Sequence, residues 1–189
     1  MEFIIIRHWW RHAHRSNFAL SKKKMMGVRK SIAIVGATEK LGEEIAFQFM
    51  DNNYSLLLIS NNKEKLDYLE KKVNAKNPKA EINFVQCVKD GCWEADIIIL
   101  TVPCDEKRSV AELMHEVATQ KIIVLFSNEE TDAQELTKFL PYSKVVRVSG
   151  DVTSKSIVIN GNDEAVNEEI SGIFNEAGYR VSKYFPANK

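Results

Sequence analysis

The sequence predicts an α/β fold in which a doubly wound, mostly parallel sheet carries helices on both faces. Short, continuously apolar segments alternate with segments whose apolar residues recur every three or four positions, as on one face of a helix. The links between these segments are short, and a glycine-containing turn over residues 36–42 separates the first strand-like segment from the first helical one. Buried strands that alternate with helices pair in parallel, because each crossover helix covers the sheet.

The first elements establish the alternation. Residues 32–35 are wholly apolar and predict a buried strand, and residues 42–52 place their apolar side chains on one helical face. Residues 56–59 form a second apolar run. Residues 63–74 carry leucine and valine at helical spacing, whereas residues 81–85 alternate as a partly exposed strand does.

The middle of the chain repeats the pattern. Residues 90–94 predict a short helix, and residues 97–102 give the strongest buried-strand signal of the sequence, ended by Pro103. We expect residues 106–117 to be helical and residues 122–126 to form a further strand. The continuous apolar character of both strands indicates burial on both faces.

The next segments lead into a second group of strands. Residues 132–140 predict a helix capped by Thr131 or Asp132. Residues 144–148 and 156–159 are both strand-like. We expect them to extend the sheet beyond the strand before them.

The last elements complete one domain. Residues 165–176 predict a helix with Gly178 as its C′ residue, and residues 179–184 predict a final strand. We expect residues 31–189 to form a single Rossmann-like domain, with no separate substrate domain after it.

Charge divides the chain into two parts. Residues 1–30 hold 8 of the 26 basic residues and 1 of the 26 acidic ones, so the remainder has a net charge of −7. An acidic domain argues against nucleic acid as its main partner. We interpret residues 1–30 as a disordered basic leader or as sequence that precedes a misassigned start.

Composition also limits the location and the metal chemistry. No apolar run approaches the roughly 20 residues of a membrane span. Cys87, Cys92 and Cys104 are odd in number and lack zinc-type spacing, which indicates reduced thiols, a cytoplasmic location and no metal site. Trp93 is expected in the core or on a lid.

The glycine turn is the first candidate binding site. Its candidate phosphate-binding residues are Gly36, Ala37, Thr38, Lys40, Leu41 and Gly42. A strand, a glycine turn and a helix in that order present free N–H groups to a dinucleotide pyrophosphate. Glu39 stands where a middle glycine is expected; it adds a negative charge, and a non-glycine residue disfavours positive φ. Alternatively, the glycines only permit close packing of strand and helix.

The end of the second predicted strand indicates which dinucleotide is bound. NAD-selective sites usually place Asp or Glu there, to hold the ribose 2′-hydroxyl. Ser60, Asn61 and Lys65 instead supply hydroxyl, amide and ammonium groups, which suit a 2′-phosphate and favour NADP. The alternative is a solvated loop that begins a charged helix.

Thr101, Val102 and Pro103 end the fourth predicted strand at the same sheet edge. In an open α/β sheet the ligand lies along the carboxyl edge, so these residues would lie near the nicotinamide. Alternatively, they only end the strand. No Ser-His-Asp set, metalloprotease motif or P-loop lysine is present, and the catalytic residues stay unassigned.

Three segments together resemble the deazaflavin-coenzyme-dependent NADP oxidoreductase family. They are residues 34–42, Ser60 with Lys65, and residues 95–103, within a similarity over about residues 31–184. The resemblance implies a Rossmann fold that passes hydride between NADP(H) and a deazaflavin.

The same resemblance implies roles for individual residues. They are Thr38 and Leu41 at the pyrophosphate, Ser60 and Lys65 at the 2′-phosphate, and Val102 and Pro103 near the nicotinamide. Asn61 replaces the family's usual arginine and lacks its charged fork. Glu39 replaces a turn glycine, and the sequence ends where the family continues with a glycine-proline segment and further helices.

We therefore expect an NADP(H)-binding, oxidoreductase-like protein that transfers hydride between NADP(H) and an organic acceptor such as a deazaflavin or flavin. The alternative is a catalytically inactive nucleotide-binding, sensor or interaction module of the same fold, which the Glu39 substitution favours. The expected partner is a small-molecule dinucleotide, not nucleic acid or a membrane, and a homodimer is also considered.

Overall fold

The computed structural model describes residues 29–103 and 105–183. The strands are β1 (Ser31–Val35), β2 (Ser55–Ile59), β3 (Ile82–Val85), β4 (Ile97–Leu100), β5 (Ile122–Phe126), β6 (Lys144–Asp151), β7 (Ser156–Gly161) and β8 (Arg180–Lys183). The helices are α2 (Lys40–Phe49), α3 (Lys63–Lys76), α4 (Val88–Glu94), α5 (Lys107–Met114), α6 (Glu130–Phe139) and α7 (Glu164–Glu176). The basic segment predicted over residues 1–30 lies outside the described residues, except for its last two.

All the strands belong to one eight-stranded sheet in the order β3-β2-β1-β4-β5-β6-β7-β8. Every neighbouring pair is parallel except β6 and β7, which form an antiparallel hairpin. The chain thus runs outward from β1 to β3, returns to β4 beside β1, and continues in the other direction. This arrangement confirms the predicted doubly wound, mostly parallel Rossmann-like fold.

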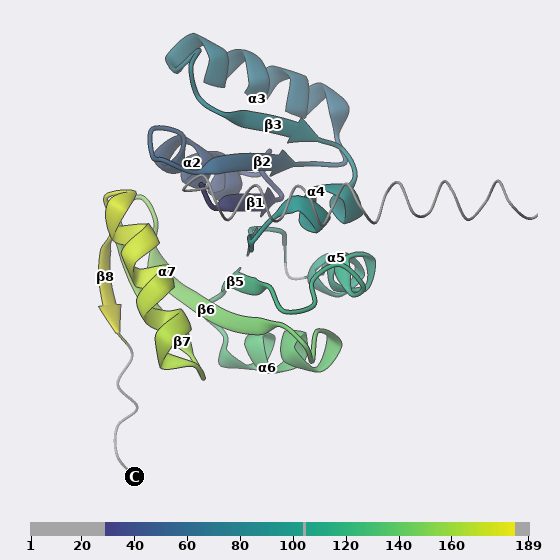
Figure 1. Ribbon diagram of the computed structural model, residues 1–189, viewed down its shortest axis with the longest axis vertical. Coiled ribbons are helices and arrows are strands. Elements are labelled where there is room, and N and C mark those ends of the chain that lie inside the picture. The colour runs from purple at the N-terminus through teal and green to yellow at the C-terminus, as the bar shows by residue number, and fades with distance from the viewer. Residues whose placement is uncertain (1–28, 104, 184–189) are drawn as a thin grey trace, which may run out of the picture.

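Helices cover both faces of the sheet (Figure 1), and each face has its own core. Alternate residues of β1 point to opposite faces: Ile32 and Ile34 join α2, α3 and α7, whereas Ala33 and Val35 join α4, α5 and α6. All four side chains are at most 2% exposed. This burial on both faces explains why the strand sequences are continuously apolar.

Two local predictions are wrong. The N-cap of α6 is Glu129, which makes no side-chain cap bond, while Thr131 and Asp132 lie inside the helix. The Asp132 carboxylate instead pairs with Lys107, so it is not available as a cap. Trp93 is 64% exposed in the last turn of α4, so the core alternative for it is wrong, and its place on a lid stays a prediction.

Helix α7 ends as the sequence predicts. Its C-cap is Ala177, and the following Gly178 has a φ of +85°, the left-handed conformation of a C′ glycine. At the other end, the Asp163 carboxylate accepts a hydrogen bond from the Val166 N–H at 3.2 Å. Within residues 29–103 and 105–183, no helix has the length and apolar character that crossing a bilayer requires.

Candidate functional site

The strand register brings the predicted site segments to one sheet edge. Val35 of β1 lies opposite Ile59 of β2 on one side and opposite Leu100 of β4 on the other. The glycine turn, Ser60 and Thr101 directly follow these three strands, so they are neighbours at the carboxyl edge. Helix α2 leaves β1 toward one face and α5 leaves β4 toward the other, which makes this the switch point of the sheet.

Hydrogen bonds tie the turn to both neighbouring strands. The N–H groups of Gly36 and Ala37 both donate to the Ile59 carbonyl, at 3.0 and 3.1 Å. On the other side, the Thr101 N–H and hydroxyl both donate to the Val35 carbonyl, at 3.0 and 2.8 Å. Thr101 therefore fixes the turn from within the protein, and its side chain is buried.

The two glycines of the turn are required by different features. Gly36 has a φ of +86°, which side-chain-bearing residues rarely adopt. At Gly42 the constraint is space, because an added Cβ would lie 2.2 Å from the Gly36 carbonyl oxygen and 2.8 Å from the Ala37 Cα. Gly42 thus lets α2 start directly against the end of β1.

The first turn of α2 offers backbone donors at this edge. Glu39 is its N-cap residue, and its side chain makes no cap hydrogen bond. The first N–H to reach back along the helix is that of Glu43, which donates to the Glu39 carbonyl at 2.8 Å. The N–H groups of Lys40, Leu41 and Gly42 therefore have no partner within the helix, and the positive end of the helix dipole adds to them.

Glu39 does not have the backbone strain expected of it. Its φ and ψ are −79° and 156°, an extended conformation open to any residue, and the positive φ of the turn is at Gly36 instead. The expectation that a non-glycine residue here disfavours the backbone conformation is therefore wrong. What Glu39 adds is its carboxylate, which pairs with Lys65 at 3.2 Å between Oε1 and Nζ.

The end of β2 combines a buried hydroxyl with an exposed ammonium. The Ser60 and Thr38 hydroxyls share a hydrogen bond of 2.7 Å, and Ser60 Oγ also accepts from the Asn62 N–H at 3.3 Å. Ser60 is only 7% exposed, whereas the Lys65 side chain is 56% exposed and Asn61 is exposed. Lys65 thus supplies the accessible cation that the sequence interpretation places at the 2′-phosphate.

At the end of β4, Val102 is buried and Pro103 is exposed. Both follow Thr101, whose hydrogen bonds to Val35 hold them beside the glycine turn. A Cβ on Gly36 would lie 3.0 Å from Val102 Cγ1, so Val102 packs directly on the turn. The structure therefore places the three predicted segments together, with an apolar contact at the β4 end.

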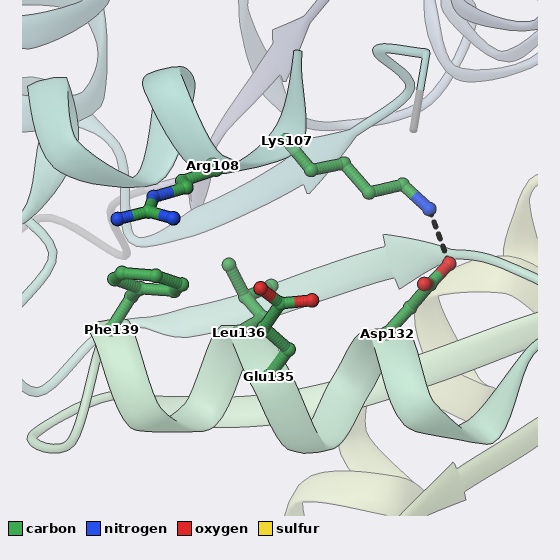
Figure 2. Close-up of a pocket in the computed structure, with 6 residues that line it drawn as sticks. All are labelled: Lys107, Arg108, Asp132, Glu135, Leu136 and Phe139. Carbon is green, nitrogen blue, oxygen red and sulfur yellow. Dashed lines mark hydrogen bonds and ion pairs between the residues drawn. The ribbon is translucent and has the colours of Figure 1, made fainter. Parts of the chain in front are cut away.

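A cavity of about 80 Å³ lies between α5 and α6 (Figure 2). Its lining residues are Lys107, Arg108, Asp132, Glu135, Leu136 and Phe139. Figure 2 shows the Arg108 guanidinium over the Phe139 ring, 5.2 Å from Cζ to the ring centre. The volume is well below the roughly 300 Å³ of typical ligand pockets, so this cavity does not fit a dinucleotide.

One polar cluster at the carboxyl end of β5 is not apparent from the sequence. Lys107 pairs with Asp132 at 2.6 Å, and the Ser127 hydroxyl donates to the same carboxylate oxygen. The hydrogen bonds from Lys107 and then from Ser127 lower the pKa of Asp132 below its usual range. The ion pair is largely buried, with the Lys107 side chain 13% and that of Asp132 21% exposed. It joins the first turns of α5 and α6.

Cys92 is a buried thiol. Burial raises the pKa of the Cys92 thiol to about 12, so it stays protonated near neutral pH. Across the described ranges, no three His, Cys, Asp or Glu side chains are grouped as metal ligands would be.

A glycine turn with uncapped helix donors, at the switch point of a parallel sheet, defines the class of dinucleotide-binding α/β domains. The family described as NADP oxidoreductase, coenzyme F420-dependent, matches residues 31–129, more than half of the sequence, and the chain belongs to this family. This match confirms the resemblance stated from the sequence. The fold is that of the NAD(P)-dependent oxidoreductases.

Several solved structures share this fold. A candidate F420-dependent NADP-reductase from Arthrobacter sp. FB24 is 15% identical, with a TM-score of 0.66 over 80% of this chain and 83% of that one. The N-terminal domain of HmdIII from Methanocaldococcus jannaschii is 15% identical, with a TM-score of 0.64 over 82% and 98%. The pyrroline carboxylate reductase of Plasmodium falciparum, solved with NADP bound, is 14% identical, with a TM-score of 0.62 over 83% and 58%. These identities show the fold alone.

A curated protein matches a shorter stretch. The very-long-chain 3-oxoacyl-CoA reductase of Vanderwaltozyma polyspora is 38% identical over 58 residues. The match covers 30% of this chain and 17% of that relative. It is too short to assign the relative's activity to this chain.

Proposed function

We propose that this protein binds NADP(H) along the carboxyl edge of β1, β2 and β4 and transfers hydride between it and an organic acceptor such as a deazaflavin or flavin. The observation that carries the proposal is the glycine turn, where Gly42 allows α2 to begin against β1 and three helix N–H groups have no partner within the helix. Such donors suit the pyrophosphate of a dinucleotide.

The residues present fit the cofactor, with one exception. The N–H groups of Lys40, Leu41 and Gly42 would hold the pyrophosphate, and Lys65 would hold the 2′-phosphate. The absence of a side chain at Gly36 leaves room for Val102 to pack on the turn. The exception is Glu39, because it is the N-cap residue of the same helix and its carboxylate carries the same sign of charge as the pyrophosphate.

The bound nicotinamide would supply the hydride donor or acceptor, and the protein would supply its position. Val102 and Pro103 would present an apolar surface at the end of β4, and Thr101 would hold that surface through its hydrogen bonds to β1. Hydride transfer to an organic coenzyme needs little acid–base chemistry from the protein. Orientation of the two ring systems is therefore the main contribution that we assign to these residues.

Glu39 weakens the site by an amount that can be bounded. Two unit charges about 4 Å apart repel by about 4 kcal/mol at an effective dielectric constant near 20. The Glu39 side chain is 45% exposed and pairs with Lys65, so solvent and the ammonium both reduce this cost. We therefore expect dinucleotide affinity in the micromolar rather than the nanomolar range.

Calorimetric titration with NADPH and NADH tests the proposal. We expect NADPH to bind more tightly and Lys65→Ala to narrow the difference, by about 1 kcal/mol or less, since an exposed ion pair contributes no more. Lys71→Ala is a matched control, because Lys71 is an exposed lysine of the same helix, two turns from the site. Equal affinities for the two cofactors in the unmodified protein, or a preference for NADH, would refute the NADP assignment.

A second candidate function is a nucleotide-binding or sensor module without catalysis. The Glu39–Lys65 ion pair favours this second function, because the pair places a carboxylate at the turn and neutralises the accessible cation. Mixing the protein with NADPH and an oxidised deazaflavin or flavin distinguishes the two. Cofactor oxidation coupled to acceptor reduction supports the enzyme, and binding without turnover supports the module.

The remaining assignments follow from the same proposal. A cytoplasmic location suits an enzyme that uses NADP(H) and carries a protonated, buried Cys92. The principal partner is the dinucleotide itself. Association into a homodimer is a further expectation, which sedimentation analysis would test.

A further inference from the structure

An ion pair links the two segments that the proposed function assigns to the cofactor phosphates. Glu39 is the N-cap of α2, and Lys65 is the third residue of α3. The Asn62 side chain accepts a hydrogen bond from the Lys65 N–H at 3.0 Å, which fixes the start of α3. Lys65 Nζ lies 3.2 Å from Glu39 Oε1, so its charge is directed at a carboxylate of the glycine turn.

We propose that Glu39 determines the preference between NADP(H) and NAD(H), by competing with the ribose 2′-phosphate for Lys65. The inference rests on the proposed function and adds to it the residue that sets cofactor specificity. The two side chains are 45% and 56% exposed, so the pair is weak and an incoming phosphate can replace the carboxylate. Lys65 therefore has an anionic partner before any cofactor arrives, and only a 2′-phosphorylated cofactor must displace it.

Ser60 and Asn61, at the end of β2, do not offset this competition. Ser60 is buried and its hydroxyl is engaged by Thr38 and by the Asn62 N–H. Asn61 is exposed and carries no charge. Recognition of the 2′-phosphate thus depends on Lys65 more than on Ser60 or Asn61.

The two effects of Glu39 on binding can be separated. Repulsion between its carboxylate and the pyrophosphate acts equally on NADPH and NADH, because both carry that group. Pairing with Lys65 acts only on NADPH, since NADH has no 2′-phosphate. The ratio of the two dissociation constants therefore cancels the repulsion of the pyrophosphate. Loss of the gain in the variant that also lacks Lys65 separates competition for Lys65 from direct repulsion between Glu39 and the 2′-phosphate.

The chain contains a matched control pair. Glu43 and Lys72 also join α2 to α3, with Oε1 and Nζ 2.5 Å apart. Glu43 is four residues beyond Glu39 and lies within the helix, not at the turn. Neutralising Glu43 removes a carboxylate–lysine bridge between the same two helices without freeing Lys65.

The experiment is a titration of NADPH and NADH into the full chain and into Glu39→Gln, Glu43→Gln, Lys65→Gln and the Glu39→Gln/Lys65→Gln double variant. We expect Glu39→Gln to raise the preference for NADPH by up to about fivefold, the upper limit that an exposed ion pair provides. Glu43→Gln should leave the preference unchanged, and the double variant should lose the gain. Circular dichroism of each variant verifies that it is folded.

Three results would overturn the inference. If Glu39→Gln strengthens both cofactors by the same factor, the competition does not exist, although the proposed function stands. The same holds if the gain in preference survives in the double variant. If none of these proteins binds either cofactor, the proposed function fails and this inference fails with it.

Discussion

Adding one methyl group to Gly42 tests the geometry of the candidate site. In Gly42→Ala the new Cβ would lie 2.2 Å from the Gly36 carbonyl oxygen, 2.8 Å from the Ala37 Cα and 2.8 Å from the Thr101 hydroxyl oxygen. Two of these neighbours are backbone atoms that sheet hydrogen bonds hold in place, so the helix must move away from β1.

The size of the effect follows from that overlap. Overpacking of a well-packed site costs about 1–3 kcal/mol, and a backbone neighbour places Gly42→Ala at the upper end, near about 3 kcal/mol. For a chain of this size about 1 kcal/mol shifts Tm by about 2–4 °C, so we expect Tm to fall by about 6–12 °C. NADPH binding should be lost as well, because α2 carries the proposed pyrophosphate donors.

Gly172→Ala provides the control. Gly172 lies in α7, and an added Cβ would meet no atom within 4 Å. Alanine is the better helix former, so this variant should gain about 0.5–1 kcal/mol in stability and retain NADPH binding. Differential scanning calorimetry measures both variants. A Gly42→Ala protein as stable as the unmodified one would refute the close contact between α2 and β1.

The other stability predictions concern polar groups near the same edge. Asp132→Asn should cost about 1–2 kcal/mol, because it removes a largely buried ion pair with Lys107. The pKa of Asp132 is lowered in the folded protein, so its contribution is present above the unfolded pKa of about 3.9 and is lost as pH falls further. Thermal melts should therefore show a gap between the two proteins that closes in acid. Glu116→Gln removes an exposed pair with Lys89, so its Tm should fall less than that of Asp132→Asn, and an equal Tm loss would contradict the role of burial. Thr101→Val should lower stability by about 1 kcal/mol by urea titration, through loss of the buried hydroxyl bond to Val35, and an unchanged midpoint would contradict this.

The order of the elements could be predicted because the signal is local. Strands buried on both faces read as continuous apolar runs, and Ile97–Leu100 is fully apolar and buried. Gly36 and Gly42 could be located by their position between strand and helix. Their separate reasons, a positive φ at Gly36 and a close contact at Gly42, required the structure.

The wrong interpretation of Glu39 shows the limit of motif reading. A motif position occupied by glycine in relatives suggests positive φ, yet this position is an extended N-cap. Because its backbone is extended, Glu39 costs no strain, and the effect on binding that we propose for it is electrostatic.

Contacts between helices could not be predicted from this sequence. Glu39 and Lys65 are 26 positions apart, and Lys107 and Asp132 are 25 positions apart. Each pair meets only because two helices begin at the same sheet edge. No sequence pattern marks either separation. The partner of Lys65 and the cluster at the end of β5 could therefore be found only in the structure.

The most direct test of the central proposal is to locate NADPH binding on an isotope-labelled sample of the full chain by nuclear magnetic resonance. If the carboxyl edge of β1, β2 and β4 binds the cofactor, the largest amide shifts should fall in residues 36–42, 60–65 and 101–102. The cavity between α5 and α6, marked by Arg108 and Phe139, should change little. Shifts centred on that cavity, or no saturable shifts at the glycine turn, would contradict the account.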